Sequence, residues 1–265
     1  MKILVTGATG NIGRIVVDEL LALGADDVRA LTVDPARAAL PAGVEVVRGF
    51  LGRPASVPLT GVDVLYLAPH RPTAHEVCRR AADAGVGRIV DLAGAKGDHW
   101  QGMEDAVEAC GVPFTHLEPG EFMANADLWG PQLRAGDVVR DTCGEAANAP
   151  IAQEDVAAVA ARILLDGAHV GRSYELTGPE SLTRRQRVAE IGAALGRDLT
   201  YVDLPRDEAV TEFGKVMGEY AAWYIDGLEM LRDHPQVAVP TVAELTGRPA
   251  MTFREWATRH ASIFG

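Results

Sequence analysis

Three glycines near the start of the chain lie at intervals of three residues, in the segment TGATGNIG. The segment follows the apolar run KILV and leads into a helical pattern, so it connects a strand to a helix. Glycines so placed permit a tight turn, a close approach of the backbone to a pyrophosphate, and close packing of helix on strand. A turn that binds nothing is the alternative, but the strand before it and the anion-binding helix N-terminus after it favour a dinucleotide. The residues expected to hold the dinucleotide are Gly7, Thr9, Gly10, Asn11, Ile12 and Gly13.

The loop GAKGDHWQGMED carries side chains that are suited to acid–base chemistry. It follows the predicted strand GRIVDLAG, and ligands of parallel sheets bind at the carboxyl ends of the strands. At that position His99 would act as a general acid and Lys96 would polarise a carbonyl, with Trp100 in the substrate pocket. The alternative is a solvated loop with no catalytic role. Glu104 and Glu108 are expected on the exposed face of the following helix.

The segment HLEPGEFMAN would form another wall of the site. Pro119 ends a predicted strand beside the cofactor, and Phe122 and Met123 would line an apolar slot for the substrate. Glu118 would face the same pocket, the alternative being a structural carboxylate held in an ion pair.

Two further loops contain candidates for cofactor and substrate contacts. Asp34 stands about 20 residues past the glycines, where an acid would accept a hydrogen bond from a ribose 2′-hydroxyl and favour NAD. A plain turn residue before Pro35 is the alternative. Arg37 would contact a phosphate, Ala68 would lie against the cofactor, and His70 would lie in the substrate pocket.

The elements that must position these residues alternate between strands and helices. Apolar runs such as VRALTV and VDVLYL alternate with helical spacings such as AHEVCRRAADAG, and Gly24, Gly85 and Gly111 stand where helices would end. This order predicts an α/β fold, a Rossmann-type doubly wound parallel sheet with a smaller C-terminal α/β substrate lobe. Residues 1–150 would form the NAD(P)-binding domain, with core strands to about 122. Residues 151–265 would form the lobe, partly packed back on the Rossmann core.

The composition excludes several classes of partner. The chain of 265 residues has a net charge of −12, which disfavours binding to nucleic acid or to an anionic membrane surface. There is no apolar run of about 20 residues and no N-terminal signal pattern, so we expect a cytoplasmic protein. The spacing of the three cysteines predicts no metal site. The expected partner is a small-molecule substrate, and the expected assembly is a monomer or homodimer.

These segments together resemble the NmrA-like family of atypical short-chain dehydrogenases/reductases. GATGNIG matches that family's opening motif, and GVPFTHLEPGEFMAN resembles its segment G-x-x-T-x-L-R-P-G-x-F-M-x-N. PIAQEDVAAVAARIL, YELTGPESLT and TGRPAMTFREWATRHASIF resemble later segments, so the likeness spans nearly the whole chain. The resemblance implies a Rossmann fold that binds NAD(P). Members of that family include quinone and aryl reductases and also non-catalytic NADP sensors.

The chain departs from the family pattern at the cofactor's adenosine end. The family has an arginine for the 2′-phosphate of NADP where this chain has Val33, and an acid for the adenine where it has Phe50. Glu118 stands where the family has an arginine. The cofactor is therefore NADP(H) or NAD(H), and the resemblance favours NADP(H).

The proton donor of typical short-chain reductases is absent from the sequence. Those enzymes use a tyrosine followed by a lysine at the fourth position, and none of the five tyrosines here has that lysine. The leading hypothesis is an NAD(P)H-dependent reductase of a small, flat, conjugated substrate, a quinone or enone, for which orientation of the partners suffices. The alternatives are a non-catalytic NAD(P)-binding redox sensor and a cofactor-independent isomerase, cyclase or lyase that reuses the fold.

Overall fold

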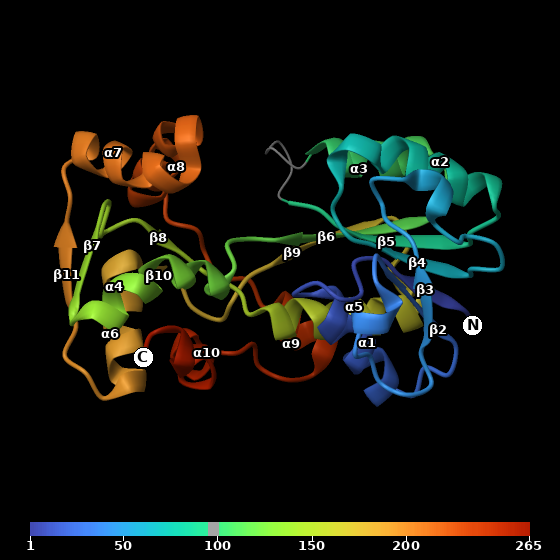
Figure 1. The fold of residues 1–265 in the computed structure, drawn as a ribbon, viewed down its shortest axis with the longest axis horizontal. Coiled ribbons are helices and arrows are strands. Elements are labelled where there is room, and N and C mark those ends of the chain that lie inside the picture. Colours follow the sequence, from blue (N-terminus) through green and yellow to red (C-terminus); the bar gives the residue numbers. More distant parts are fainter. Residues whose placement is uncertain (95–100) are drawn as a thin grey trace. The chain divides into compact units, whose positions relative to one another are not determined.

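The structure, a computed structural model, describes residues 1–94 and 101–265 and divides into two compact units (Figure 1). Unit 1 comprises residues 1–120, 153–176 and 241–248, and unit 2 comprises residues 121–152, 177–240 and 249–265. Each unit is therefore assembled from segments that are separated in the sequence. The linear division at residue 150 stays a prediction about where cofactor and substrate functions divide.

Unit 1 is built on a seven-stranded sheet in which every described pair of neighbouring strands is parallel. The strand order is β3-β2-β1-β4-β5-β6-β9, so the chain reverses its direction of winding after β3. This is the Rossmann-type doubly wound sheet predicted from the sequence. The strands are β1 (Ile3–Val5), β2 (Val28–Thr32), β3 (Glu45–Arg48), β4 (Val64–Leu67), β5 (Arg88–Leu92), β6 (Phe114–Pro119) and β9 (Arg172–Leu176).

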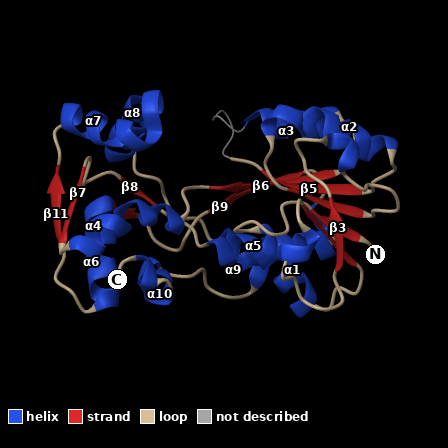
Figure 2. Cartoon of the chain, viewed as in Figure 1, coloured by secondary structure: helices blue, strands red, loops and turns tan. Residues whose placement is uncertain are grey.

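Helices cover both faces of this sheet (Figure 2). On one face α1 (Gly13–Ala22) packs against α5 (Gln153–Leu165), which also contacts α9 (Thr241–Thr246). On the other face α2 (Ala74–Asp83) packs against α3 (Gln101–Ala109). Because both faces are buried, β1 and β4 are apolar without alternation, as parallel strands require.

Local sequence signals set several helix ends. Gly24, Gly85 and Gly111 have φ values of +87°, +76° and +74°, as expected of the glycines predicted after the helices. In unit 2, Thr183 and Gln186 form the reciprocal capping box that starts α6 (Arg184–Leu195). Gly196 ends that helix in the left-handed conformation.

Unit 2 has a small core and two short strand pairs. Strand β7 (Val138–Asp141) pairs in parallel with β11 (Thr200–Asp203), and β8 (Ala147–Asn148) pairs antiparallel with β10 (Leu182–Thr183). Trp129, Trp256 and Phe253 are almost fully buried in its apolar cluster. The remaining helices are α4 (Gly130–Ala135), α7 (Arg206–Met217), α8 (Ala221–Asp233) and α10 (Phe253–Arg259). Within the described residues, no helix has both the length and the apolar character needed to span a bilayer.

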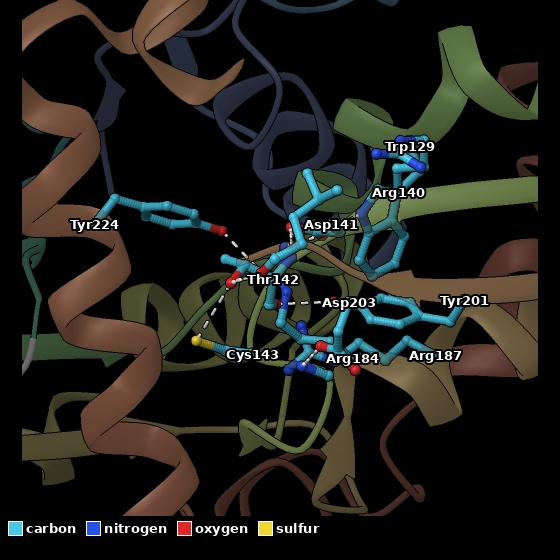
Figure 3. Close-up of polar contacts among 12 residues, drawn as sticks. Trp129, Arg140, Asp141, Thr142, Cys143, Arg184, Arg187, Tyr201, Asp203 and Tyr224 are labelled. Atoms are coloured by element: carbon cyan, nitrogen blue, oxygen red, sulfur yellow. Dashed lines mark hydrogen bonds and ion pairs between the residues drawn. The ribbon is translucent and has the colours of Figure 1, made fainter. Parts of the chain in front are cut away.

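A buried polar network lies next to that apolar core (Figure 3). The Asp141 carboxylate accepts a hydrogen bond from Trp129 Nε1 at 2.6 Å and pairs with the guanidinium of Arg184, and both charged side chains are 1% exposed. Arg184 also donates to the Tyr224 hydroxyl at 3.2 Å, and Tyr201 donates to the Thr142 carbonyl at 2.8 Å. The network therefore joins α6, α8, β7 and β11 of unit 2 through one charge pair.

Candidate cofactor and substrate site

The glycine turn after β1 has the geometry of a dinucleotide cradle. Gly7 adopts a φ of +61°, and its N–H and carbonyl groups lie at the carboxyl end of β1. A Cβ at Gly13 would lie 2.2 Å from the Gly7 carbonyl oxygen, and one at Gly10 would lie 3.2 Å from it. The turn is thus close-packed in a way that only glycine permits.

The same turn leaves backbone donors for an anion. The Gly10 N–H donates to the Gly7 carbonyl at 2.8 Å, and the Arg14 N–H donates to the Gly10 carbonyl at 3.1 Å. The N–H groups of Asn11 and Ile12 have no backbone acceptor in the described part of the chain. They stand at the start of α1, where the helix dipole favours a phosphate, so the turn fits the pyrophosphate of a dinucleotide.

Side chains fix the turn to neighbouring strands. The Thr6 hydroxyl donates to the Tyr66 carbonyl at 2.9 Å and accepts from the Ala68 N–H at 2.8 Å. The Thr9 and Thr32 hydroxyls lie 3.2 Å apart. The structure therefore brings the predicted cofactor residues on the β1, β2 and β4 ends to one edge of the sheet.

Asp34 has a local structural role. Its carboxylate accepts a hydrogen bond from the Ala36 N–H at 3.2 Å and begins a single turn of 3-10 helix at Pro35. This is the geometry of the turn alternative, and contact with a ribose stays a prediction. Arg37 lies in that turn with its side chain exposed, and no ion pair is found for it in the described residues.

A hollow of about 580 Å³ lies beside this turn, at the ends of β2 and β3. Its lining residues are Val33, Arg48, Gly49, Phe50, Arg53 and Ser56. Neither arginine forms an ion pair within the described residues, although most arginines of the chain are paired, so two free guanidinium groups border one hollow. His70 lies near Phe50, with ring centroids 5.5 Å apart, and its Nδ1 is 2.7 Å from the Thr73 hydroxyl. His70 therefore lies beside this hollow, and its substrate contact stays a prediction.

A buried group of titratable side chains lies between the sheet and α3. His116 on β6 and Asp91 on β5 are fully buried, and His116 Nδ1 lies 2.6 Å from Asp91 Oδ1. Glu104, in the first turn of α3, is also fully buried, so the expectation that it lies on an exposed helix face is wrong. It shares the inward face of α3 with Met103 and Val107.

Burial and neighbouring charges change the acidity of these groups. Burial, together with the adjacent Glu118 carboxyl, raises the pKa of Glu104 to about 7, while His116 acts in the opposite direction. Burial also raises the pKa of Asp91. Burial would lower the pKa of His116, but the hydrogen bond to Asp91 and the nearby acids outweigh it and raise that pKa. We call Asp91, Glu104, His116 and Glu118 the carboxyl cluster.

The segment after β6 belongs to both units. Glu118 is half-buried and precedes Pro119, the buried last residue of β6 in unit 1. Phe122 is half-buried and bridges to Ile151 in unit 2, while Met123 is 1% exposed in the core of that unit. The structure thus gives Met123 a packing role, and the slot predicted for Phe122 and Met123 stays a prediction. Lys96, His99 and Trp100 lie outside the described residues.

Comparisons with known proteins show the family to which this chain belongs. Residues 7–167, more than half of the chain, match the family model described as NAD(P)H-binding. The chain belongs to the NAD(P)H-binding family. It is an NAD(P)H-dependent oxidoreductase of the atypical short-chain group that the sequence resembles.

Individual relatives agree along the full length. The chain is 38% identical to a (4-alkanoyl-5-oxo-2,5-dihydrofuran-3-yl)methyl phosphate reductase of Streptomyces griseus subsp. griseus, over 99% of each chain. It is 34% identical to an NAD(P)H azoreductase of Xenophilus azovorans, also over 99% of each chain. The Escherichia coli NADPH-dependent quinone oxidoreductase solved with NADPH superposes with a TM-score of 0.86 at 26% identity, covering 97% of this chain and 99% of that one.

Sequence reasoning missed Arg48, Arg53, Asp91 and His116, and it placed Glu104 on the wrong face of its helix. Arg48 and Arg53 border the hollow at the ends of β2 and β3, and the turn between them, which no local motif signals, brings both to it. Asp91 and His116 face each other because β5 and β6 are in register at these two positions. A signal existed only for Glu104, because its spacing of three from Val107 places it on the apolar stripe of the helix.

Proposed function

We propose that this chain reduces small, flat, conjugated acceptors of the quinone and enone class. The observation that carries the proposal is the close-packed glycine turn with free N–H groups at the start of α1. Bound NAD(P)H supplies a hydride there, and the protein holds the nicotinamide and the acceptor close together in the orientation that hydride transfer requires.

The names of the relatives support the acceptor class. They describe reductases of an azo compound, a quinone and an alkanoyl-oxo-dihydrofuran phosphate. All three acceptors contain a planar conjugated system in which charge from an incoming hydride is delocalised. Such acceptors need no strong acid held at the reacting atom.

The tyrosines of unit 1 support the same conclusion. Tyr66 on β4 is 1% exposed, and burial raises the pKa of its hydroxyl. The Tyr174 hydroxyl is 2.7 Å from His169 Nδ1. Neither is followed by a lysine at the fourth position, as the tyrosine donor of typical short-chain reductases is, so alcohol oxidation, which needs a base, is disfavoured.

The proposal includes a preference for NADPH. The free guanidinium groups of Arg48 and Arg53 border the hollow next to Val33, which stands where the family's phosphate-binding arginine stands. Arginine pairs bind phosphates through several charge-assisted hydrogen bonds. We assign these two side chains, from the end of β3 and the turn after it, to the 2′-phosphate of NADPH in place of the missing arginine.

Two measurements test the proposal. Wild-type protein titrated with NADPH and NADH, followed by nicotinamide fluorescence, is expected to bind NADPH more tightly. Arg48→Gln and Arg53→Gln should each weaken NADPH binding by about tenfold, with NADH binding unchanged, because each loses a charged phosphate contact. Arg79→Gln, on the exposed side of α2, is the matched control. Equal losses for both cofactors would contradict the assignment.

The second measurement is consumption of NADPH in the presence of a panel of quinones and enones. Consumption with several members and none with simple alcohols plus NADP+ supports the proposed function. Binding of NADPH without consumption by any acceptor would contradict it. Three further statements stay predictions from the sequence. They are a monomeric or homodimeric assembly, a cytoplasmic location and no nucleic-acid partner.

A further inference from the structure

The carboxyl cluster contains polar atoms that the described chain leaves without donors. Asp91 Oδ2, Glu104 Oε1 and Glu118 Oε1 are buried and accept no hydrogen bond from an N–H or hydroxyl group. The Glu104 and Glu118 carboxyls interact both through a hydrogen bond and through charge, and two ionised carboxylates so placed would repel each other in a region of low dielectric. A single proton held between Glu104 and Glu118 satisfies both oxygens, as in other buried carboxyl pairs.

The cluster also reaches the surface at two points. His116 Nε2 lies 3.5 Å from Oε1 of Glu108, whose side chain is 50% exposed. At the other end Glu118 is half-buried, next to Pro119 at the carboxyl end of β6. That end of the parallel sheet is also the edge at which the glycine turn follows β1.

We propose that Glu104 and Glu118 form a shared-proton carboxyl pair that stores the proton consumed in each reduction. This inference rests on the proposed function for its delivery step. The acceptor gains two electrons and one hydrogen as hydride, and the anion so formed takes one proton from the pair. The pair then carries two negative charges until it takes up one proton from water. Glu104 acts through Glu118, so it is a positioning residue.

The groups that face the pair set the range of pH over which it can work. Asp91 on β5 and His116 on β6 form a hydrogen-bonded pair beside it, and Glu108 lies one turn along α3. From α2 the thiol of Cys78 is buried toward the same side of the sheet, and burial raises its pKa. Because burial raises the pKa of Glu104 to about 7, the stored proton is present at neutral pH and is lost in mild alkali.

The first test needs no turnover. Infrared difference spectra of the full chain, recorded across pH 5 to 9, should show the C=O band of a protonated carboxyl that disappears near pH 7. Glu104→Gln should lack the titrating band. Glu76→Gln, which removes an exposed acid from α2, should keep it. Absence of the band from the wild type would overturn the proposal that Glu104 and Glu118 share a proton.

The second test measures delivery of the stored proton to the reduced acceptor. In the wild type, kcat for quinone reduction should fall as pH rises through about 7, and Glu104→Gln and Glu118→Gln should lose that limb of the pH profile. At pH 8 their solvent deuterium isotope effects should also differ from that of the Glu76→Gln control. Unchanged profiles in both variants, with folding verified by thermal unfolding, would overturn delivery of the proton by this pair. A titrating band in a protein that consumes no NADPH would overturn the delivery step by contradicting the proposed function, leaving only a structural pair.

Discussion

At Gly13 a single added methyl group should weaken cofactor binding. An alanine Cβ there would meet the Gly7 carbonyl oxygen at 2.2 Å, so the turn would have to move. We expect Gly13→Ala to weaken NADPH binding by more than about tenfold, since the turn no longer fits the pyrophosphate. Gly214→Ala, in α7 with open space at its Cβ, is the control and should bind NADPH normally. Normal binding of NADPH by Gly13→Ala would contradict the proposal that this turn holds the pyrophosphate.

Glu104 should make the free energy of unfolding depend on pH in a recognisable direction. The folded protein holds this proton to about pH 7, whereas the unfolded chain releases it near 4.5. The folded state therefore binds more protons between those values, and the contribution of Glu104 to stability declines as pH rises through this window. Glu104→Gln should be more stable than the wild type at pH 8 by roughly 1–3 kcal/mol, with the difference shrinking toward pH 5.

Urea unfolding at pH 5 and pH 8 measures this difference directly. Glu76→Gln, which removes an exposed acid, should show almost no dependence of its stability difference on pH. A Glu104→Gln protein that is destabilised at pH 8 would mean that the ionised carboxylate is needed for folding.

The turn glycines and Glu104 show which roles of single residues can be predicted from the sequence. Gly7, Gly10 and Gly13 act through backbone geometry over seven consecutive positions, so their spacing is sufficient to predict the turn. Glu104 is charged, and a charged residue in an amphipathic helix is ordinarily exposed. Its spacing from Val107 is the one sign of its burial in the sequence, and its interaction with Glu118, which lies on a different element, has no local signal.

At the scale of elements, the stability of unit 2 should depend on the buried ion pair between Asp141 and Arg184. Asp141→Leu would leave the Arg184 guanidinium 1% exposed without its carboxylate, at a cost of about 3–5 kcal/mol. Adding Arg184→Met removes the stranded charge, so the double variant should regain part of the loss. Urea unfolding of the single and double variants measures the coupling.

An exposed ion pair provides the comparison for this prediction. Asp83→Ala breaks the pair with Arg79 on the surface of α2 and should cost less than about 1 kcal/mol. A double variant less stable than Asp141→Leu would show that Arg184 contributes through Tyr224 and Trp129 more than through the charge pair.

Whether a segment forms a helix or a strand was more predictable than which other element it pairs with. The helix from Arg184 to Leu195 begins and ends at its local capping signals, Thr183 and Gly196. Strand β9 is separated in the sequence from β6 by the first segment of unit 2 and by α5, and it becomes the seventh strand of the large sheet beside β6. That pairing is long-range, because four of the five residues of β9 are at least partly exposed and carry no pattern that selects a partner strand.

At the scale of the whole molecule, binding of the cofactor should stabilise the chain. A ligand that binds only the folded state at about 100 times its Kd adds about 2.7 kcal/mol to the free energy of unfolding. We expect NADPH to raise the thermal midpoint more than NADH at equal concentration, and Arg48→Gln to remove the difference. Thermal unfolding with each cofactor checks this, and identical shifts in the wild type would contradict the preference for NADPH.

Hydride transfer from NAD(P)H to a conjugated acceptor can be followed by a single labelling experiment. NADPH deuterated at the transferring position of the nicotinamide is mixed with the protein and an enone, and the product is examined by mass spectrometry. An enone is chosen because the transferred deuterium stays on carbon and does not exchange with water. The account predicts one deuterium in the reduced product and stoichiometric NADP+. An unlabelled product, or no product with NADPH bound, would contradict it.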